Sequence, residues 1–416
     1  MKKTTCFSFL LVILFASADL HASGFAVFSQ GAASFGRAGA SIARLDSPSA
    51  VFYNPALISQ LDGTQVELGT TGVRLVFEQK SDATGETATT DSDLFFPSTL
   101  YATHGVNEQI SFGLGIFSPF GLASQWGKTW EGRYLATDSE LSTVCVNPVI
   151  SVAVTPNLSI AGGVNYLDLD TSLENNINLS GYKLGDGERK FDGDGSDYGF
   201  TLGLAWAVTR RVHLGLSYRS GYSVDLDGSI SFDLPAGTPA AIAQALPDTG
   251  AQATLDLPEE AFASIAFQVT GELMVETGIL WEGWSDYDTI ETRFDRPVFG
   301  ATTDIMVKEW KDTLTYNLGL EYLYSDDLTL RTGYLYREGA VPDHTFDPSL
   351  PDADAHLLAL GGDYGWGRYT LSLAYVYEWQ EERDKETNLG ADLGGTANGR
   401  YNSDIHFLAA SLKMKF

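Results

Sequence analysis

Few side chains in this sequence are arranged for catalysis or metal binding. The six histidines are scattered, and they form neither a Ser/His/Asp arrangement nor a cluster with metal-ligand spacing. Carboxylates gather most densely in Asp192-Gly-Asp194-Gly-Ser-Asp197, but this run lacks the Gly and Glu positions of an EF-hand loop. We interpret it as a solvated loop. The sequence therefore predicts no enzyme, no metal site and no cofactor.

The formal net charge of -28 argues against nucleic acid as a partner, because a phosphate backbone attracts a basic surface. Much of this charge falls in segments that we expect to be loops, so it predicts a solvated surface. Divalent cations at a cell surface are a further partner that the charge leaves open.

The elements that position the remaining residues are long strands. Between Val212 and Leu226 every second residue is apolar or tyrosine, except Ser220, and the residues between them are mostly Gly, Ser or charged. A period of two places the two sets on opposite faces of a strand. A strand of about fifteen residues is much longer than the usual five or six of globular proteins. Such length suits a barrel that spans a membrane.

The C-terminal part repeats this pattern. Residues 368–380 alternate with Val376 as the one apolar exception, and the last strand alternates up to the terminal residue, Phe416. A terminal aromatic residue on such a strand resembles the signal that barrel-assembly machinery reads in outer-membrane proteins. We therefore expect that machinery to be a partner during biogenesis.

The N-terminus predicts secretion. Lys2 and Lys3 precede an apolar run from Phe7 to Ala18, and a small residue, Ala22, offers a cleavage site. The alternative, an uncleaved anchor, needs about 20 apolar residues, and this run is shorter. Cleavage after Ala22 would leave Cys145 as the single cysteine, so the mature chain would have no intramolecular disulfide.

Marking every alternating run predicts about fourteen strands, an even number as expected for bacterial single-chain barrels. The predicted spans are 65–78, 95–106, 108–118, 139–154, 157–174, 196–209, 211–232, 251–269, 271–294, 304–324, 327–337, 354–364, 367–382 and 401–416. The connections alternate between short turns and long loops, as periplasmic turns and extracellular loops do. The fold class is therefore all-β, a transmembrane antiparallel barrel in the bacterial outer membrane, in contact with its lipid and lipopolysaccharide.

Residues 23–63 do not alternate. This segment is rich in Gly, Ala and Ser, and its apolar residues, such as Phe25, Phe35 and Phe52, would be awkward in a free periplasmic tail. A plug inside the lumen is the favoured interpretation. The predicted organisation is a signal peptide over 1–22, a plug or hatch over 23–63 and the barrel over 64–416, as a monomer.

Several stretches resemble the FadL/TodX family of outer-membrane transporters. They are Gly24-Phe25, Gly36-Arg37-Ala38, Asn54-Pro55-Ala56-Leu57, Phe120-Gly121-Leu122, Gly132-Arg133-Tyr134, Asn147-Pro148, Asp197-Tyr198-Gly199-Phe200, Leu216-Ser217-Tyr218-Arg219-Ser220, Leu257-Pro258-Glu259 and Trp281 with Trp284-Ser285. The resemblance spans essentially the mature chain and rests on the order and spacing of these motifs. It implies a fourteen-stranded barrel that moves long-chain fatty acids or aromatic hydrocarbons.

The resemblance implies a hatch and a side opening. Asn54, Pro55 and Ala56 would hold the hatch, while Ser23, Gly24 and Phe25 would reach toward the ligand. Taken alone, Asn-Pro is also a common turn dipeptide. The run Phe117-Ser118-Pro119-Phe120-Gly121 would be an inward kink of the third strand that opens the wall sideways. The alternative is that the strand simply ends at Ser118, before a loop.

The resemblance also implies a ligand site. Trp310-Lys311-Asp312 resembles a family segment whose lysine binds the carboxylate of a fatty acid, and alternation places Lys311 on the lumen face with Thr313. The alternative is that Lys311 pairs with Asp312 or Glu309 near the rim. Some family members add an arginine from the fifth strand, but residues 157–174 contain none, so Arg133 is a substitute from a loop. This departure leaves the ligand open between a fatty acid and a neutral hydrocarbon.

The expected mechanism is downhill uptake. Loops 119–138 and 233–250, the latter with a short apolar helix over 239–246, would form an acceptor groove, and ligand would then shift the hatch and leave sideways. A general porin would need an open, charged lumen without an apolar plug. An outer-membrane enzyme is a weaker alternative, and an adhesive role of the loops would coexist with transport.

Overall fold

The computed structural model describes residues 24–27, 30–91 and 94–416. The predicted signal peptide and Ser23 lie outside these residues. Among the described residues, no helix is long and apolar enough to cross a membrane.

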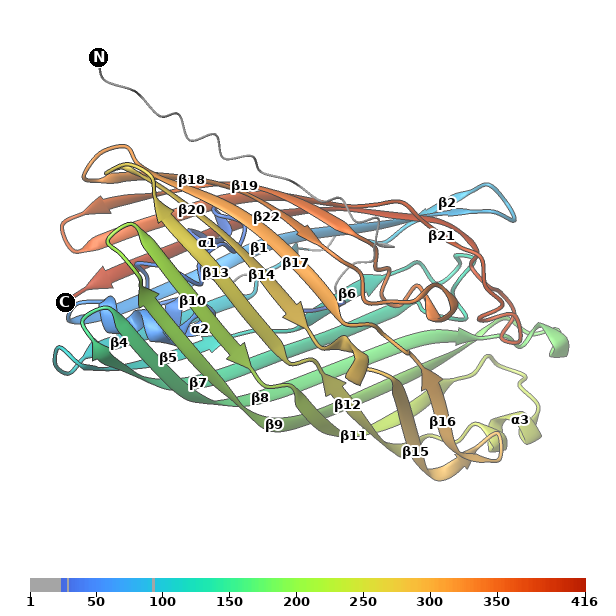
Figure 1. Cartoon of the computed structure of the whole chain (residues 1–416). Coiled ribbons are helices and arrows are strands. Elements are labelled where there is room, and N and C mark those ends of the chain that lie inside the picture. The colour runs from blue at the N-terminus through green and yellow to red at the C-terminus, as the bar shows by residue number, and fades with distance from the viewer. Residues whose placement is uncertain (1–23, 28–29, 92–93) are drawn as a thin grey trace, which may run out of the picture.

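The wall is a closed antiparallel barrel of fourteen strands (Figure 1), as predicted. Some wall strands are single elements: β1 (Thr64–Ser81), β4 (Ser98–Gly105), β7 (Asp138–Thr155), β8 (Leu158–Ile177), β9 (Gly187–Ala207), β18 (Leu328–Arg337), β19 (Ala355–Trp366), β20 (Tyr369–Gln380) and β22 (Gly399–Lys415). Each of the other five is interrupted: β5 (Ile110–Phe117) with β6 (Gly121–Gln125), β10 (Val212–Arg219) with β11 (Tyr222–Asp233), β12 (Thr249–Leu257) with β13 (Glu260–Gln268), β14 (Leu273–Glu282) with β15 (Thr289–Val298), and β16 (Ala301–Val307) with β17 (Thr313–Leu323). The barrel closes where β22 pairs with β1.

Shorter elements lie at the two ends or inside the wall. They are α1 (Ala32–Phe35), α2 (Ala50–Tyr53), η1 (Pro55–Gln60), β2 (Thr87–Thr89), β3 (Leu94–Phe95), η2 (Ser180–Tyr182), α3 (Ala240–Ala245), η3 (Trp284–Asp286), η4 (Asp343–Thr345) and β21 (Arg383–Lys385). The C-terminus lies at the end with short turns, and α3, β2 and β21 lie at the opposite end (Figure 1). The predicted short helix in the 233–250 loop is confirmed as α3.

The outer face of β8 shows where the membrane lies. Its outward residues are apolar from Leu158 to Tyr166, a length that matches the roughly 9–11 residues of a tilted spanning strand. Beyond Tyr166, whose ring lies 5.2 Å from that of Tyr198 on β9, the outward residues are Asp168 and Asp170. The tyrosine pair therefore marks the outer edge of the apolar band.

The acidic run from Asp192 to Asp197 is part of β9, so its interpretation as a loop was wrong. Its residues alternate as the wall does, and Asp192 and Asp194 are exposed beside β8. A strand that continues past the bilayer needs polar residues on its outer face, which gives it the composition of a loop. Among the described residues, no group of three or more His, Cys, Asp or Glu side chains is placed to hold a metal ion.

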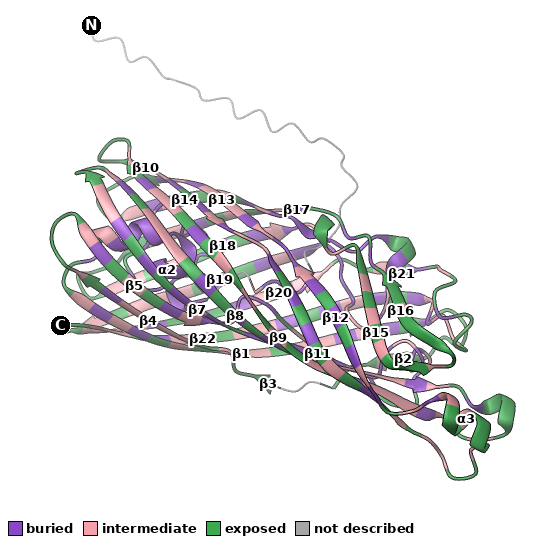
Figure 2. Cartoon of the chain, turned by 90° about the horizontal axis from the view of Figure 1, so that it is seen from below, coloured by how far each residue is buried: buried purple, intermediate pink, exposed green. Residues whose placement is uncertain are grey.

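Residues 30–63 fill the lumen at the end with short turns. Buried and exposed residues alternate along the wall strands, and the helices of this segment lie inside the barrel, surrounded by those strands (Figure 2). Inward-facing glycines make room for it: a Cβ on Gly215 would lie 2.0 Å from the carbonyl oxygen of Ile42, and one on Gly333 would lie 2.4 Å from the carbonyl carbon of Arg37. Glycine is needed at these positions because the two backbones nearly touch.

Candidate functional site

The third wall strand is kinked between β5 and β6. Phe117 pairs with Cys145 of β7 and Gly121 pairs with Ser142, so the kinked strand takes four steps where β7 takes three. The extra residue is a bulge, and Pro119 within it offers no N–H to a ladder. The Thr143 hydroxyl accepts from the Phe120 N–H at 3.1 Å and donates to its carbonyl at 2.6 Å. The strand resumes at Gly121, so the predicted loop over 119–138 begins too early.

Phe25, Val27 and Gln30 cross this kink on the lumen side of the wall. The Val27 N–H donates to the carbonyl of Pro119 at 2.8 Å, and the Gly121 N–H donates to the carbonyl of Phe25 at 3.0 Å. The Gln30 amide donates to the carbonyl of Ser118 at 2.6 Å. Phe25, Val27 and Gln30 therefore satisfy three backbone groups of the kink, and Thr143 satisfies those of Phe120.

The side chain of Phe25 occupies an aromatic box. Its ring centroid lies 5.0 Å from that of Trp284, 5.7 Å from Tyr287, 5.8 Å from Trp310 and 6.2 Å from Phe120, all with edge-to-face geometry. Gly24 has a positive φ of 57°, and a Cβ there would lie 2.6 Å from the Trp284 ring. The box holds an apolar group of the chain itself, in a place that could hold an apolar ligand.

A cavity of about 350 Å³ connects this region to the outer surface. On β7 it is lined both by inward-facing residues, Leu141 and Thr143, and by outward-facing ones, Glu140 and Ser142. Its lining also includes Phe25 and, at the outer side, the largely exposed Phe96. A cavity that touches both faces of one strand passes through the wall.

The gap in the wall lies beside β6. Among the described residues, β6 has a ladder only with β7, and Gln125 at its end accepts from the N–H of Asp91 at 2.9 Å. Across the gap lie β3 and Pro97, which line the same cavity. Outward-facing Val144 next to Ser142 begins the apolar outer face of β7. The opening therefore adjoins the apolar band.

The cavity is apolar apart from a few side chains. Its charged lining residues are Glu140, at the outer surface, and Arg337 and Glu378, in the lumen. Arg337 reaches from β18 across β19 to β20, where its guanidinium lies 2.8 Å from a carboxylate oxygen of Glu378. Both side chains are buried. The cavity thus contains one buried ion pair in a mostly apolar lining.

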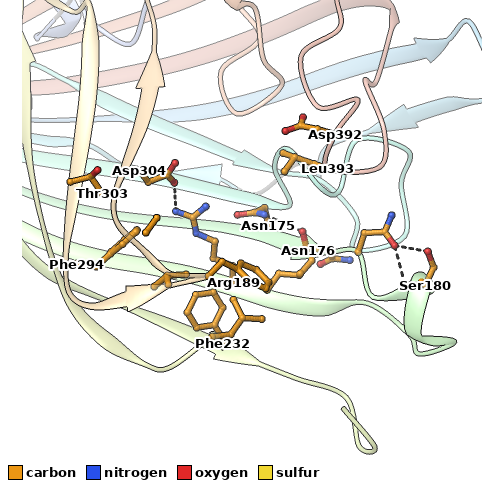
Figure 3. A pocket seen from close by; sticks show the side chains of 17 residues that line it. Asn175, Asn176, Ser180, Arg189, Phe232, Phe294, Thr303, Asp304, Asp392 and Leu393 are labelled. Carbon is orange, nitrogen blue, oxygen red and sulfur yellow. Dashed lines mark hydrogen bonds and ion pairs between the residues drawn. The ribbon is translucent and has the colours of Figure 1, made fainter. Parts of the chain in front are cut away.

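A second hollow, of about 540 Å³, lies among the extracellular segments (Figure 3). Phe232, Phe294 and Leu393 contribute apolar surface, and an ion pair joins Arg189 to Asp304 at 2.9 Å. Of the two loops predicted to form an acceptor groove, 233–250 contributes Leu246 to this hollow, whereas 119–138 contributes nothing. The latter instead stacks Trp126 on Trp130, 4.3 Å apart.

The predicted hatch residues lie inside the lumen. The Asn54 side-chain amide donates to the carbonyls of Ile42 at 2.8 Å and Leu204 at 2.9 Å, and its oxygen accepts from the Ala56 N–H at 3.1 Å. Pro55 begins η1, where its missing N–H is harmless. Asn54 therefore joins two parts of the segment to the wall, away from the cavity.

Lys311 and Arg133 do not line the cavity. The strand predicted over 304–324 is interrupted between β16 and β17, and Lys311 lies exposed in that break, with its N–H donating to the Ala340 carbonyl at 2.9 Å. The alternation argument for Lys311 fails because it assumed one continuous strand. The buried lysine there is Lys308, whose Nζ lies 2.9 Å from Asp347.

Arg133 is held in an extracellular loop by Asp186, at 2.6 Å, and by the Tyr134 hydroxyl. Burial alone would raise the pKa of the Asp186 carboxyl, but hydrogen bonds from Arg133 and Tyr134 outweigh it and hold that pKa below its usual value. The structure therefore brings together Phe25 and the kink, and leaves the two predicted cations elsewhere.

The ion pair of Arg337 and Glu378 was missed in the sequence. Alternation places Glu378 opposite Tyr377 and Trp379, which indicates a lumen-facing carboxylate on an otherwise aromatic strand. Arg337 stands at the last position of a predicted strand, and no local pattern links it to a residue 41 positions later. The sequence pattern places each residue on its strand, but no pattern indicates that the two form an ion pair.

A family described as "outer membrane protein transport protein (OMPP1/FadL/TodX)" matches residues 13–416. The chain belongs to this family. It is a bacterial outer-membrane transporter of hydrophobic compounds, as the sequence predicted, and not an enzyme.

Individual relatives are distant. A long-chain fatty acid transport protein of Salmonella typhi is 23% identical over 78% of this chain and 79% of its own. A Pseudomonas aeruginosa FadL homologue has a TM-score of 0.85, with 22% identity over 95% of this chain and all of that chain. The Pseudomonas putida toluene transporter TodX has a TM-score of 0.74, with 20% identity over 96% and 99% of the two chains. At these identities the structures share the fold, and the ligand of this transporter is a separate question.

Proposed function

We propose that this transporter takes up long-chain fatty acids or related hydrophobic compounds, neutral hydrocarbons included, and releases them sideways through the kink of its third strand. The observation that carries the proposal is the cavity at β7, which is lined by both faces of that strand and adjoins the apolar band. The Salmonella typhi and Pseudomonas putida relatives, named for fatty acid and toluene transport, are consistent with either class.

The physical problem is the polar lipopolysaccharide leaflet, which slows apolar molecules. A water-filled pore would not help, because burying apolar surface is worth roughly 25 cal/mol per Å² and the solute would leave the water. A dry path into the hydrocarbon layer avoids that step. The hollow around Phe232 and Phe294 is the proposed acceptor at the cell surface.

Phe25 is the residue through which a ligand would displace the hatch. Its ring fills the aromatic box, so a ligand that enters the box competes with it for the same contacts. Displacement of residues 24–30 would also break the bonds from Val27 to Pro119 and from Phe25 to Gly121. Ligand binding and release of the kink are thereby coupled through one short segment.

A general porin is the weaker alternative. Its lumen would be open and charged, whereas residues 30–63 fill this lumen with buried apolar side chains such as Val51, Phe52 and Leu57. Diffusion of small polar solutes would have no path through that packing.

Uptake of radiolabelled oleate and of radiolabelled hexadecane tests the proposal, in cells that lack their own transporter. Ala123 faces outward on β6 and lines the cavity, so Ala123→Trp should fill the opening and abolish uptake of whichever compound is carried. The matched control is Ala263→Trp, on the outer face of β13, away from the kink. Both variants must reach the outer membrane at equal levels.

Uptake that continues at the wild-type rate in Ala123→Trp would refute sideways release. Lys311→Ala, measured in the same cells, tests the anchor predicted from the sequence. Loss of oleate uptake in that variant would restore Lys311 to the ligand site despite its exposed position.

A further inference from the structure

The cavity contains no unpaired cation with which to hold a carboxylate. Among the described residues, Arg337 is the one cation in its lining, and the guanidinium already binds Glu378 at 2.8 Å. The Glu378 side chain is 2% exposed, and the Arg337 side chain is 9% exposed. In such a site an ion pair is held strongly, because separating the charges would leave each one buried alone.

Other buried cations of the described residues are also occupied. Arg37 lies within ion-pair distance of Glu276 and Glu321, Lys308 pairs with Asp347, Arg219 with Glu260, and Arg331 with Asp363 and Glu321. Lys385 is surrounded by three neutral oxygens, of Thr387, Thr396 and Asn398, at 2.5 to 3.3 Å. Among the buried cations named here, Lys385 alone has no carboxylate partner, and it does not line the cavity.

A further buried acid, Asp352, lies near Arg337. Asp352 is buried and accepts backbone N–H bonds from Ala340 and Val341 at 3.0 and 3.2 Å. It lies close enough to Arg337 and to the backbone of Gly24 for both to stabilise its charge. An incoming anion beside Arg337 would therefore lie close to the Glu378 carboxylate, in surroundings of low dielectric.

A neutral polar group meets a different situation. The Nε–H of Arg337 is buried and has no acceptor among the described residues. A hydroxyl, ester or ketone oxygen could accept from this N–H without displacing Glu378. A plain hydrocarbon has no acceptor atom and would leave this N–H without a hydrogen bond.

We propose that the Arg337–Glu378 pair makes this channel select compounds with an uncharged head group over carboxylates of the same chain length. The inference rests on the proposed function and names the ligand class of that same site. Arg337 and Glu378 are specificity-determining residues in it.

The test compares oleate with oleyl alcohol, which share the same chain and differ in the head group. Binding of each tritiated compound to the full-length purified protein in detergent is measured by scintillation proximity at pH 8. Signal from the Ala123→Trp variant is subtracted as micelle background. We expect the alcohol to bind about tenfold more tightly than oleate, or better, since a like charge beside a buried carboxylate is strongly unfavourable.

Glu378→Gln keeps the shape of the side chain and frees the guanidinium. It should tighten oleate binding about tenfold, by creating a free cation, and leave the alcohol nearly unchanged. Glu381→Gln, an exposed acid three residues later, should change neither affinity. The double variant Arg337→Gln/Glu378→Gln removes both charges and should bind oleate no more tightly than the wild type.

If the wild type binds oleate as tightly as the alcohol, this inference is overturned and the proposed function still stands. An unchanged ratio in a folded Glu378→Gln variant would do the same. If that variant does not fold, the wild-type ratio and the double variant still decide. Binding of neither compound above the Ala123→Trp background would overturn the proposed function as well.

Discussion

The N-terminal segment has two parts that are held in different ways. Residues 24–27 and Gln30 contact the kink and the aromatic box through hydrogen bonds and the ring of Phe25. Residues 31–63 are tied to the wall by buried charge: the Glu276 carboxylate accepts the N–H groups of Ile42 and Ala43 at 2.7 and 2.8 Å and lies 3.9 Å from Arg37.

The difference indicates which part moves. Gly24, Phe25 and Val27 make backbone hydrogen bonds and ring contacts, so their displacement removes one hydrogen bond from the buried Asp352 but separates no ion pair. Release of residues 31–63 would carry Arg37 away and leave Glu276 buried in the wall without its partner, which is unfavourable by several kcal/mol. We therefore expect transport to displace the first part and to leave the second in place.

Glu276→Ala should give the largest effect, because it removes the carboxylate that anchors residues 31–63, the fixed part of the segment. The change leaves Arg37 and three backbone N–H groups without their carboxylate, so we expect anchoring of residues 31–63 to weaken by about 3–5 kcal/mol. Planar-bilayer recordings should then show frequent ion-conducting openings. The control is Glu272→Ala, which changes an exposed turn residue four positions before Glu276; its channel should stay closed. A closed Glu276→Ala channel would mean that other contacts hold this part.

Asn54→Asp should give the next largest effect. An aspartate cannot donate to the carbonyls of Ile42 and Leu204, and it places a charge against both of them. We expect a loss of about 1–3 kcal/mol, seen as faster hydrogen exchange over residues 42–56. Asn107→Asp is the matched control, because Asn107 uses only its oxygen, as acceptor from Gln109 and Ile110. Equal exchange in both variants would remove Asn54 from the anchor.

Much of the fold followed from the sequence because a barrel wall has a period of two. Alternation predicted fourteen strands, with short turns at one end and the C-terminus in the last strand, and these features depend on local pattern alone. Asn54 was predicted to hold the hatch, and it bonds two parts of that segment to the wall. Its role in gating stays a prediction.

The site was predicted less well, because its parts depend on interruptions and on distant pairs. Alternation runs on through the break between β16 and β17, which led to Lys311 being placed on the lumen face. Arg337 and Glu378 lie on β18 and β20, with β19 between them, and meet across that strand. No single-strand pattern encodes such a contact.

Phe25→Ala tests the movable part. It removes the ring that competes with ligand, so we expect affinity for oleyl alcohol to rise several-fold, since a larger fraction of molecules has an open box. Hydrogen exchange should speed up over residues 24–30 and stay unchanged over 31–63. The control is Phe267→Ala, a phenylalanine 41% exposed on the outer face of β13. Exchange that speeds up across the whole segment would show that the two parts move together.

Asp352→Asn should give the smallest effect, a change in pH dependence. Burial raises the pKa of the Asp352 carboxyl to about 7, against the partial opposition of Arg337, Arg383 and backbone N–H groups. An unfolded aspartate has a pKa of about 3.9, so between about pH 4 and 7 the folded chain binds more protons, and its stability falls as pH rises. Above about pH 7 this contribution is constant.

The asparagine variant lacks this pH-dependent contribution. Its unfolding midpoint should therefore fall less between pH 5 and 8 than that of the wild type, by about 1–3 °C. Asp326→Asn, in an exposed turn, should keep the wild-type slope. Because the backbone of Gly24 stabilises the charged form of Asp352, protonation should loosen the movable part before the fixed one. Identical slopes in wild type and Asp352→Asn would show that this carboxyl does not sense pH.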